Sequence, residues 1–306
     1  MASRAAGDYP EVPAPLPHPG VDTHTHLDIC TGARGPIKSG EPSPEVEPGE
    51  DEEFPPLSFF HDTAMQAGIT RIMQIGCDMR SARWTAELVA GEAAAGRDWM
   101  LGGVAIHPNE APRLAAVGLL EESLTEIESL TAGPRMRVVG ETGLDYFRTE
   151  GEGVIAQQES FRAHIEIAKR RGLALQIHDR NAHADVLRIL AEEGAPDVTV
   201  FHCFSGDAAF ARECAERGYY MSFAGNITFK NAADLRHAAA VVPAHLLLSE
   251  TDAPFLTPHP HRGRPGGPYL TAVTLRKLAE VREAPLAELC EQITANAEQA
   301  FGAWEL

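Results

Sequence analysis

The sequence is short of cysteine, of basic residues and of long apolar runs, and each shortage excludes a class of protein. Its five cysteines are widely spaced, with no CxxC pair, so we expect reduced thiols that mostly fill the core of a cytoplasmic protein. No run approaches the roughly 18 apolar residues of a spanning helix, and no secretion signal opens the chain. Lys and Arg number 26 against 44 Asp and Glu, a formal net charge of −18, which argues against a broad basic surface for nucleic acid.

Two segments differ in composition from the rest of the chain. Residues 1–18 are rich in Pro and Ala and lack periodicity, so we expect a disordered N-terminal tail. Residues 31–57 form an acidic, Pro-rich insertion. We interpret this insertion as a solvated loop, and the alternative is a lid or a partner-docking loop beside the functional site. Residues 19–306 would then make one domain that carries the insertion.

Short apolar runs alternate with helical patterns along this domain. After a first strand at 21–28, we expect strands near 69–75, 99–106, 136–140, 173–177, 198–201, 219–223 and 246–249. The expected helices are 58–68, 81–95, 114–130, 157–171, 182–193, 208–217, 231–241, 271–282 and 286–301. Apolar strands that alternate with helices indicate a parallel sheet, and eight such units in about 280 residues predict an α/β fold, the (β/α)8 TIM barrel. A doubly wound open sheet is the alternative, but no glycine fingerprint follows the first strand.

The first strand carries a His-x-His pair. Residues two apart on a strand face the same side, so His24 and His26 present two imidazoles together, which suits a metal better than a core. TIM barrels carry their catalytic groups at the carboxyl ends of the strands. The other ionisable residues expected at these ends are His107, Glu141, His178, His202 and Asp252.

Such a cluster would be costly to bury unless its members were paired or bound to metal. Mixed imidazole and carboxylate ligands suit one or two divalent ions such as Zn²⁺, Mn²⁺ or Mg²⁺. Two ions would provide hydroxide at neutral pH, because metal binding lowers the pKa of water. Glu141, at the centre of the rim, could bridge both ions, and Asp252 could bind one ion and take the proton from the attacking water.

Several motifs, in this order, resemble the TatD family of metal-dependent deoxyribonucleases within the amidohydrolase superfamily, over about residues 20–302. They are DTHTHLD at 22–28, GETGLDY at 140–146, QIHDR at 176–180, HCFSG at 202–206, ITFKN at 227–231, ETDAP at 250–254 and Asn-Ala at 296–297. The resemblance implies a TIM barrel, two divalent ions and phosphodiester hydrolysis, typically trimming of DNA from the 3′ end. It maps the metal ligands to His24, His26, Glu141, His178, His202 and Asp252, makes Asp252 the general base, and places His107 near the substrate.

Two stretches depart from the family's pattern. The acidic insertion is longer than the family's usual loop and would repel a polyanion if it folded over the rim. After Arg264 the family usually reads Asn-Glu-Pro, whereas this chain reads Pro-Gly-Gly-Pro at 265–268.

Six side chains are candidates for contact with the substrate: His107, Asp145, Tyr146, Arg180, Arg262 and Arg264. Arg262 and Arg264 could clamp a phosphate, and Arg180 could meet another. Tyr146 could stack on a base. For each of them the alternative is an ordinary structural role.

The leading hypothesis is a cytoplasmic metal-dependent hydrolase that acts on DNA, with RNA as a further substrate, and has no membrane or obligate protein partner. A second hypothesis keeps the metals and makes the substrate an ester, amide or lactone, or an aminoacyl-tRNA ester, which the negative charge favours slightly. A third is a non-enzymatic scaffold with a retained barrel, which would need lost ligands, and all six are present.

Overall fold

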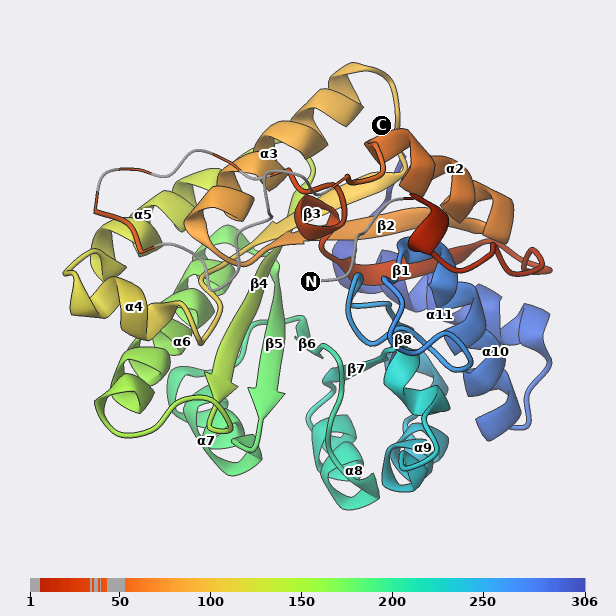
Figure 1. The fold of residues 1–306 in the computed structure, drawn as a ribbon. Helices are drawn as coiled ribbons and strands as arrows, with labels where there is room; N and C mark the ends of the chain where they lie inside the picture. The colour runs from red at the N-terminus through yellow and green to blue at the C-terminus, as the bar shows by residue number, and fades with distance from the viewer. Residues whose placement is uncertain (1–5, 34, 36–37, 39, 43–52, 306) are drawn as a thin grey trace.

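The computed structural model describes residues 6–33, 35, 38, 40–42 and 53–305. Eight parallel strands follow one another around a single sheet in chain order, and a bridge between Thr25 and Ala253 brings the last strand back to the first. The sheet is therefore a nearly closed barrel (Figure 1). Its strands are β1 (Gly20–Thr25), β2 (Ile69–Gly76), β3 (Met100–Val104), β4 (Met136–Asp145), β5 (Ala174–Arg180), β6 (Thr199–Phe201), β7 (Tyr220–Phe223) and β8 (Leu247–Ser249).

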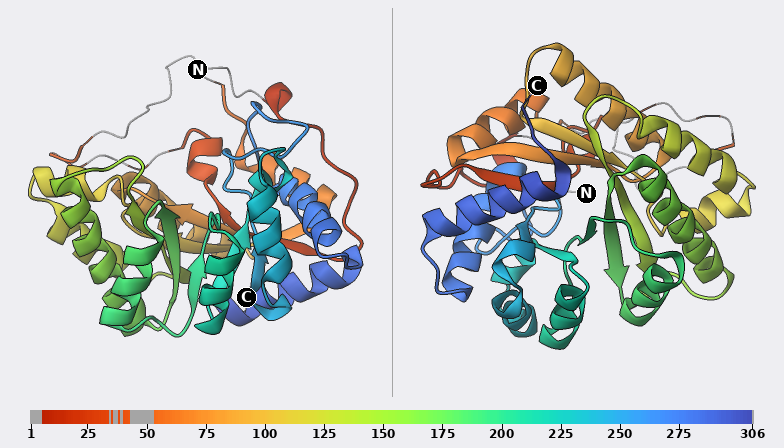
Figure 2. Two further views of the ribbon diagram at one scale, coloured as in Figure 1. Left: turned by 90° about the horizontal axis from the view of Figure 1, so that it is seen from below. Right: turned by 180° about the vertical axis from the view of Figure 1, so that it is seen from behind.

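Helices surround this sheet on the outside, as the further views in Figure 2 show. They are α1 (Leu27–Cys30), α2 (Leu57–Ala67), α3 (Met79–Ala94), α4 (Ala111–Ala116), α5 (Leu120–Leu130), α6 (Glu152–Arg171), α7 (His183–Glu193), α8 (Ala208–Glu216), α9 (Ala233–Val241), α10 (Thr271–Val281) and α11 (Leu286–Phe301). Short 3₁₀ turns are η1 (Ala6–Asp8), η2 (Gly225–Thr228), η3 (Ala244–Leu246) and η4 (Pro268–Leu270). The (β/α)8 TIM barrel expected from the alternation of apolar runs is confirmed.

The strands are apolar because the barrel buries both of their faces. Val21, Ile72, Val138 and Leu248 have no exposed surface. The interior is tight at β3, where a Cβ on Gly103 would lie 2.6 Å from Ile75 Cδ1. Helices cover the outer face of the sheet and packed side chains fill its interior. Polar side chains therefore gather at the rim formed by the carboxyl ends of the strands.

Two elements differ from the sequence prediction. The helix expected at 114–130 is two helices, α4 and α5, because Gly118 between them has a φ of +73° that turns the chain. Strand β4 was expected to end at residue 140 but continues to Asp145, where it pairs with Arg180 of β5. Glu141 therefore lies within a strand and not after its end.

The N-terminal segment is not the disordered tail that its composition suggested, at least from residue 6 onward. The ring of Tyr9 is buried against Phe59 and Phe60, with centroids 5.4 Å from each. The Arg264 side chain donates to the carbonyls of Asp8 and Tyr9. The Tyr269 hydroxyl donates to the Pro10 carbonyl, and the Arg276 side chain donates to the carbonyls of Ala14 and Pro15. A segment with few hydrogen bonds of its own is thus held by side chains from the C-terminal third. The rest of the expected tail, residues 1–5, lies outside the described residues.

The insertion at 31–57 is described only in part, since residues 43–52 lie outside the described residues. Glu41 accepts from Arg83 of α3 at 2.6 Å, and Arg83 also contacts Glu126 of α5 at 2.7 Å. The Glu41 side chain is 8% exposed, so this acid belongs to a buried ion-pair network and not to a solvated loop. No helix in the described ranges is long and apolar enough to cross a membrane.

Candidate metal centre

Strand β1 brings the two imidazoles of the His-x-His pair together. The Nε2 atoms of His24 and His26 are 3.2 Å apart, and both rings are buried. The other nitrogen of each ring is held: His24 Nδ1 lies 2.9 Å from Gln176 Oε1, and His26 Nδ1 lies 3.0 Å from the Ile75 carbonyl. An acceptor at Nδ1 places the proton of the neutral ring there, so Nε2 keeps its lone pair for a cation.

Glu141 lies at the centre of the cluster, and the five imidazoles around it come from four different strands or the loops that follow them. Its Oε2 is 2.6 Å from His202 Nε2 and 3.2 Å from His178 Nδ1. The longer approaches are 3.8 Å from Oε2 to His107 Nε2, 3.5 Å from Oε1 to His26 Nε2 and 3.8 Å from Oε1 to His24 Nε2. Each carboxylate oxygen thus faces a different group of rings, as expected of a bridging ligand.

Asp252 enters from the loop after β8. Its Oδ1 lies 3.3 Å from His26 Nε2 and 4.0 Å from His24 Nε2. The main-chain N–H of Asp252 donates to the His24 carbonyl at 2.9 Å, which fixes the loop to β1. The Asp252 side chain is 16% exposed, against 6% for Glu141. Of these two carboxylates, Asp252 is therefore the one open to the mouth of the barrel.

The electrostatics of the cluster favour an ionised Glu141 carboxylate beside a protonated His26 imidazole. Burial opposes ionisation of Glu141, but His202, His107 and His178 outweigh it and hold its pKa well below the usual range. Burial likewise opposes protonation of His26, yet Asp252 and Glu141 raise its pKa to about 10. The ionised Glu141 carboxylate therefore attracts cations, whether protons or metal ions.

The donor set fits divalent metal ions. Among the residues that the structure describes, three groups have potential ligand atoms within 4.8 Å of one another: His24, His26 and Glu141; His107, Glu141 and His178; and His24, His202 and Glu250. His202 Nε2 is buried, and Glu141 Oε2 lies 2.6 Å away. Two potential ligand atoms that converge in this way are suited to a shared cation. Mixed imidazole and carboxylate donors suit Zn²⁺ or Mn²⁺.

Two residues that hold ligands in place, Gln176 and Glu250, were not among the predicted site residues. Gln176 of β5 accepts a hydrogen bond from His24 Nδ1 through Oε1 at 2.9 Å and donates from Nε2 to the Thr23 carbonyl at 2.8 Å. Glu250 Oε1 lies 3.2 Å from His202 Nδ1 and accepts the Cys203 N–H at 2.7 Å. Gln176 stands two residues before His178 on the same strand, so the period of two that revealed the histidine pair was a signal for it too.

Two of the six candidates for substrate contact have polar groups that are bonded within the protein. Asp145 is buried, and its oxygens accept from the main-chain N–H groups of Phe147 and Arg148, from the Asn109 amide and from His178. The expectation that Asp145 meets the substrate is therefore wrong, because both oxygens are taken. The Tyr146 hydroxyl donates to Asp185 at 2.7 Å, and the exposed ring is that of its neighbour, Phe147.

Of the three arginines predicted to contact phosphate, Arg264 is bonded within the protein, whereas Arg180 and Arg262 stack on aromatic rings. Arg264 is not placed to clamp a phosphate, because its guanidinium is bound to the N-terminal segment. Arg180 lies over the Phe147 ring at 3.9 Å and Arg262 over the Phe229 ring at 4.0 Å. These two therefore remain candidates for contact with an anion.

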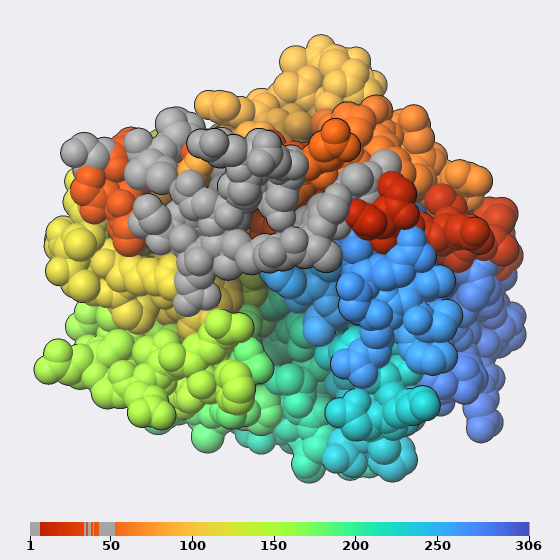
Figure 3. Space-filling model, in the orientation of Figure 1, coloured from red at the N-terminus to blue at the C-terminus, as the bar shows by residue number. Residues whose placement is uncertain are grey.

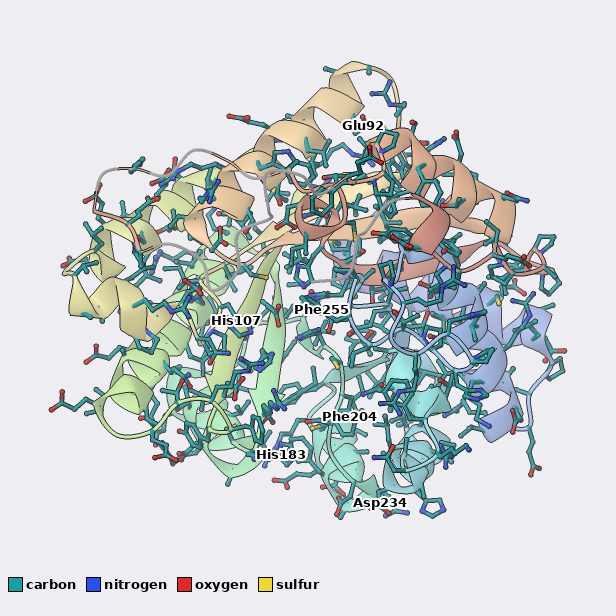
Figure 4. The ribbon with its side chains drawn as sticks, in the orientation of Figure 1. Glu92, His107, His183, Phe204, Asp234 and Phe255 are labelled. Carbon is teal, nitrogen blue, oxygen red and sulfur yellow. The ribbon has the colours of Figure 1, made fainter. Side chains whose placement is uncertain are left out.

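His107 is the remaining candidate, and it follows β3. Burial lowers the pKa of His107 to about 3, so the ring is neutral at ordinary pH. Its Nδ1 accepts the Asn109 N–H at 3.0 Å, which leaves Nε2 facing Glu141. Figure 4 shows His107 beside β4 and Phe255 beside β1.

Known proteins resemble this chain in sequence and in fold over most of its length. The family model described as TatD related DNase matches residues 21–302. A Mycobacterium tuberculosis protein named as an uncharacterized metal-dependent hydrolase, TatD, is 39% identical over 286 residues, which cover 92% of this chain and 97% of that protein. The uncharacterized metal-dependent hydrolase YabD of Bacillus subtilis is 36% identical and covers 76% of this chain and 88% of its own. The crystal structure of YJJV, a TatD homolog from Escherichia coli K12, has a TM-score of 0.73 and 26% identity and covers 93% of this chain and 98% of its own.

Proposed function

The chain belongs to the TatD family of metal-dependent hydrolases, and on that premise we propose that it hydrolyses the phosphodiester bonds of DNA, trimming from a 3′ end, with RNA as a further substrate. The observation that carries the proposal is the cluster around Glu141, in which carboxylate and imidazole donors converge beneath an open mouth. Arg180 and Arg262 supply positive charge beside that mouth, in a chain whose net charge is −18.

The residues that would hold two divalent ions are His24, His26, Glu141, His178, His202 and Asp252. Bound ions at such a centre supply Lewis-acid stabilisation of a phosphoryl group and lower the pKa of water. Gln176 and Glu250 orient the imidazoles, and a fixed orientation keeps the ligand nitrogens aimed at the centre. Asp252, the more open carboxylate, takes the proton of the attacking water, and the neutral His107 lies beside the substrate.

Single-stranded oligonucleotides labelled at the 5′ or the 3′ end, incubated with Mg²⁺, Mn²⁺ or Zn²⁺, test the proposal. We expect a ladder of shortened 5′-labelled products and early release of a 3′-terminal label. Glu141→Gln, which removes the central charge at nearly constant shape, should abolish the ladder. If the protein cleaved no oligonucleotide with any of the three ions but hydrolysed carboxylic esters, lactones or amides, the proposal of a DNA substrate would be wrong and a carbonyl compound would be the substrate.

The five cysteines are free thiols in the structure, which agrees with the cytoplasmic location that we propose. Cell fractionation of the native host measures it directly. Recovery of the protein outside the cytoplasmic fraction would contradict it.

A further inference from the structure

Two exposed aromatic rings stand at the mouth of the barrel. Large hydrophobic side chains that are exposed in the described ranges are few: Val117, Phe147, Ile155 and Phe255. Phe147, 61% exposed, follows β4, and Phe255, 49% exposed, follows β8. In a barrel of eight strands in sequential order, β4 and β8 face one another across the opening. The surface is recessed between the segments that follow these two strands (Figure 3).

Each ring neighbours one side of the metal centre. The Phe255 ring centroid lies 6.2 Å from that of His26, with the planes inclined at 68°. Phe147 stands two residues after Asp145, whose Oδ2 is 3.2 Å from His178 Nε2. A chain bound across the centre would therefore pass both rings.

Unpaired cations accompany the rings. Arg180 lies over Phe147, and Arg262, in the same loop as Phe255, lies over Phe229. Throughout the described ranges, neither guanidinium forms a hydrogen bond or an ion pair with the protein, whereas Arg83, for example, contacts two carboxylates. Stacking on a ring orients a guanidinium and leaves its N–H donors free for a phosphate.

We propose that the mouth is an aromatic clamp for single-stranded nucleic acid, in which nucleobases on either side of the scissile bond stack on Phe147 and Phe255. Arg180 and Arg262 pair with the neighbouring phosphates. The clamp rests on the proposed phosphodiesterase function, and it makes that function selective for unpaired strands, whose base faces are accessible. Because every base has a π-face, the clamp is tolerant of sequence.

The test compares Phe147→Ala and Phe255→Ala with Ile155→Ala, a matched control that removes an exposed apolar side chain (58%) that is not part of the clamp. Three probes are used with the metal-loaded protein: a single-stranded oligonucleotide, an abasic oligonucleotide of equal length, and methyl 4-nitrophenyl phosphate. Each clamp variant should raise KM for the base-containing strand about tenfold. Phe147→Trp and Phe255→Trp should restore it, and the Ile155→Ala variant should match the wild type.

The same defect should be absent or small on the abasic strand and on the small diester, which offer phosphates without bases. Arg180→Gln should reduce the slope of log Kd against log salt by about 0.7, the contribution of one phosphate contact on a single strand. Equal KM values for the alanine variants and the wild type would refute the clamp and leave the hydrolase intact.

Failure of the proposed function has a different signature. The wild type would then cleave neither the oligonucleotide nor methyl 4-nitrophenyl phosphate with any of the three ions. Fluorescence anisotropy with the labelled strands decides the clamp in that case. Equal affinity for base-containing and abasic strands would reject it, and a preference for bases that Phe147→Ala abolishes would support it.

Discussion

Glu250 provides the sharpest test of how the barrel holds its metal ligands. Its Oε1 contacts both His202 Nδ1 at 3.2 Å and the Cys203 N–H at 2.7 Å, and the carboxylate is fully buried. Glu250→Gln keeps an oxygen that can accept both bonds and removes the charge. Glu250→Ala removes the acceptor as well. The pair of variants therefore separates the charge of Glu250 from its hydrogen bonds.

The expected magnitudes follow from these contacts. Loss of the partner that orients a metal-bound imidazole costs about 10- to 100-fold in metal affinity, which corresponds to about 1.4–2.8 kcal/mol. We expect Glu250→Gln to fall in this range, because a neutral partner makes the imidazole a weaker ligand. Glu250→Ala should also lower the free energy of unfolding by about 1–3 kcal/mol, since the partly buried Cys203 N–H loses its acceptor.

Competition with a chelating dye measures the Zn²⁺ and Mn²⁺ affinities, and urea unfolding of the metal-free protein measures stability. Glu288→Gln is the control, because it neutralises an exposed carboxylate on α11. Wild-type metal affinity in Glu250→Gln would refute the idea that this charge tunes His202. An unchanged unfolding free energy in Glu250→Ala would refute the idea that its hydrogen bonds hold the strand end.

Other predictions concern the base, proton release and the insertion. Asp252→Asn should retain the fold by circular dichroism but lose at least about 100-fold in kcat; near-wild-type turnover would remove Asp252 from the role of base. Burial opposes protonation of His26, but Asp252 and Glu141 raise its pKa to about 10, so His26 holds a proton at pH 7 that a metal ion must displace. Metal affinity should therefore fall as pH falls. Calorimetry in buffers of different ionisation enthalpy should show proton release on metal binding, and its absence would contradict the assignment of His26 as a metal ligand. Arg83 lowers the pKa of Glu126 to about 2, so the stability from this contact is present above pH 4.5, the usual pKa of a glutamate, and is lost as pH falls toward 2. Arg83→Ala should lower the unfolding free energy by roughly 1–3 kcal/mol at pH 7, and the difference in unfolding free energy from the wild type should narrow below pH 4.5. A difference that does not depend on pH would contradict the ion-pair explanation.

The sequence predicted the barrel and its rim because both are encoded in short periods. Apolar runs separated by helical patterns gave strands that the structure places within a few residues of expectation. The position of polar residues at strand ends gave the histidines and carboxylates that the fold brings together around Glu141. Local pattern therefore carried both the fold class and the candidate ligands.

Contacts between distant segments could not be predicted in the same way. Arg264 contacts Asp8 across 256 residues, and no local pattern distinguishes an arginine that binds main-chain carbonyls from one that binds phosphate. His202 and Glu250 meet across 48 residues because the strands β6, β7 and β8 are adjacent at one rim. The end of β4 was misjudged because its continuation through Asp145 depends on the pairing with β5.

The way in which the N-terminal segment is held bears on how this protein can diverge. The side chains that bind it contact main-chain oxygens of residues 8–10 and 14–15, which every amino acid provides. Much of the segment can therefore change in sequence without losing its attachment, while Arg264, Tyr269 and Arg276 cannot. Alignment of relatives would show drift before residue 21 beside constancy near the other end of the chain, and the three donors would be the better guide to whether a relative retains the attached segment.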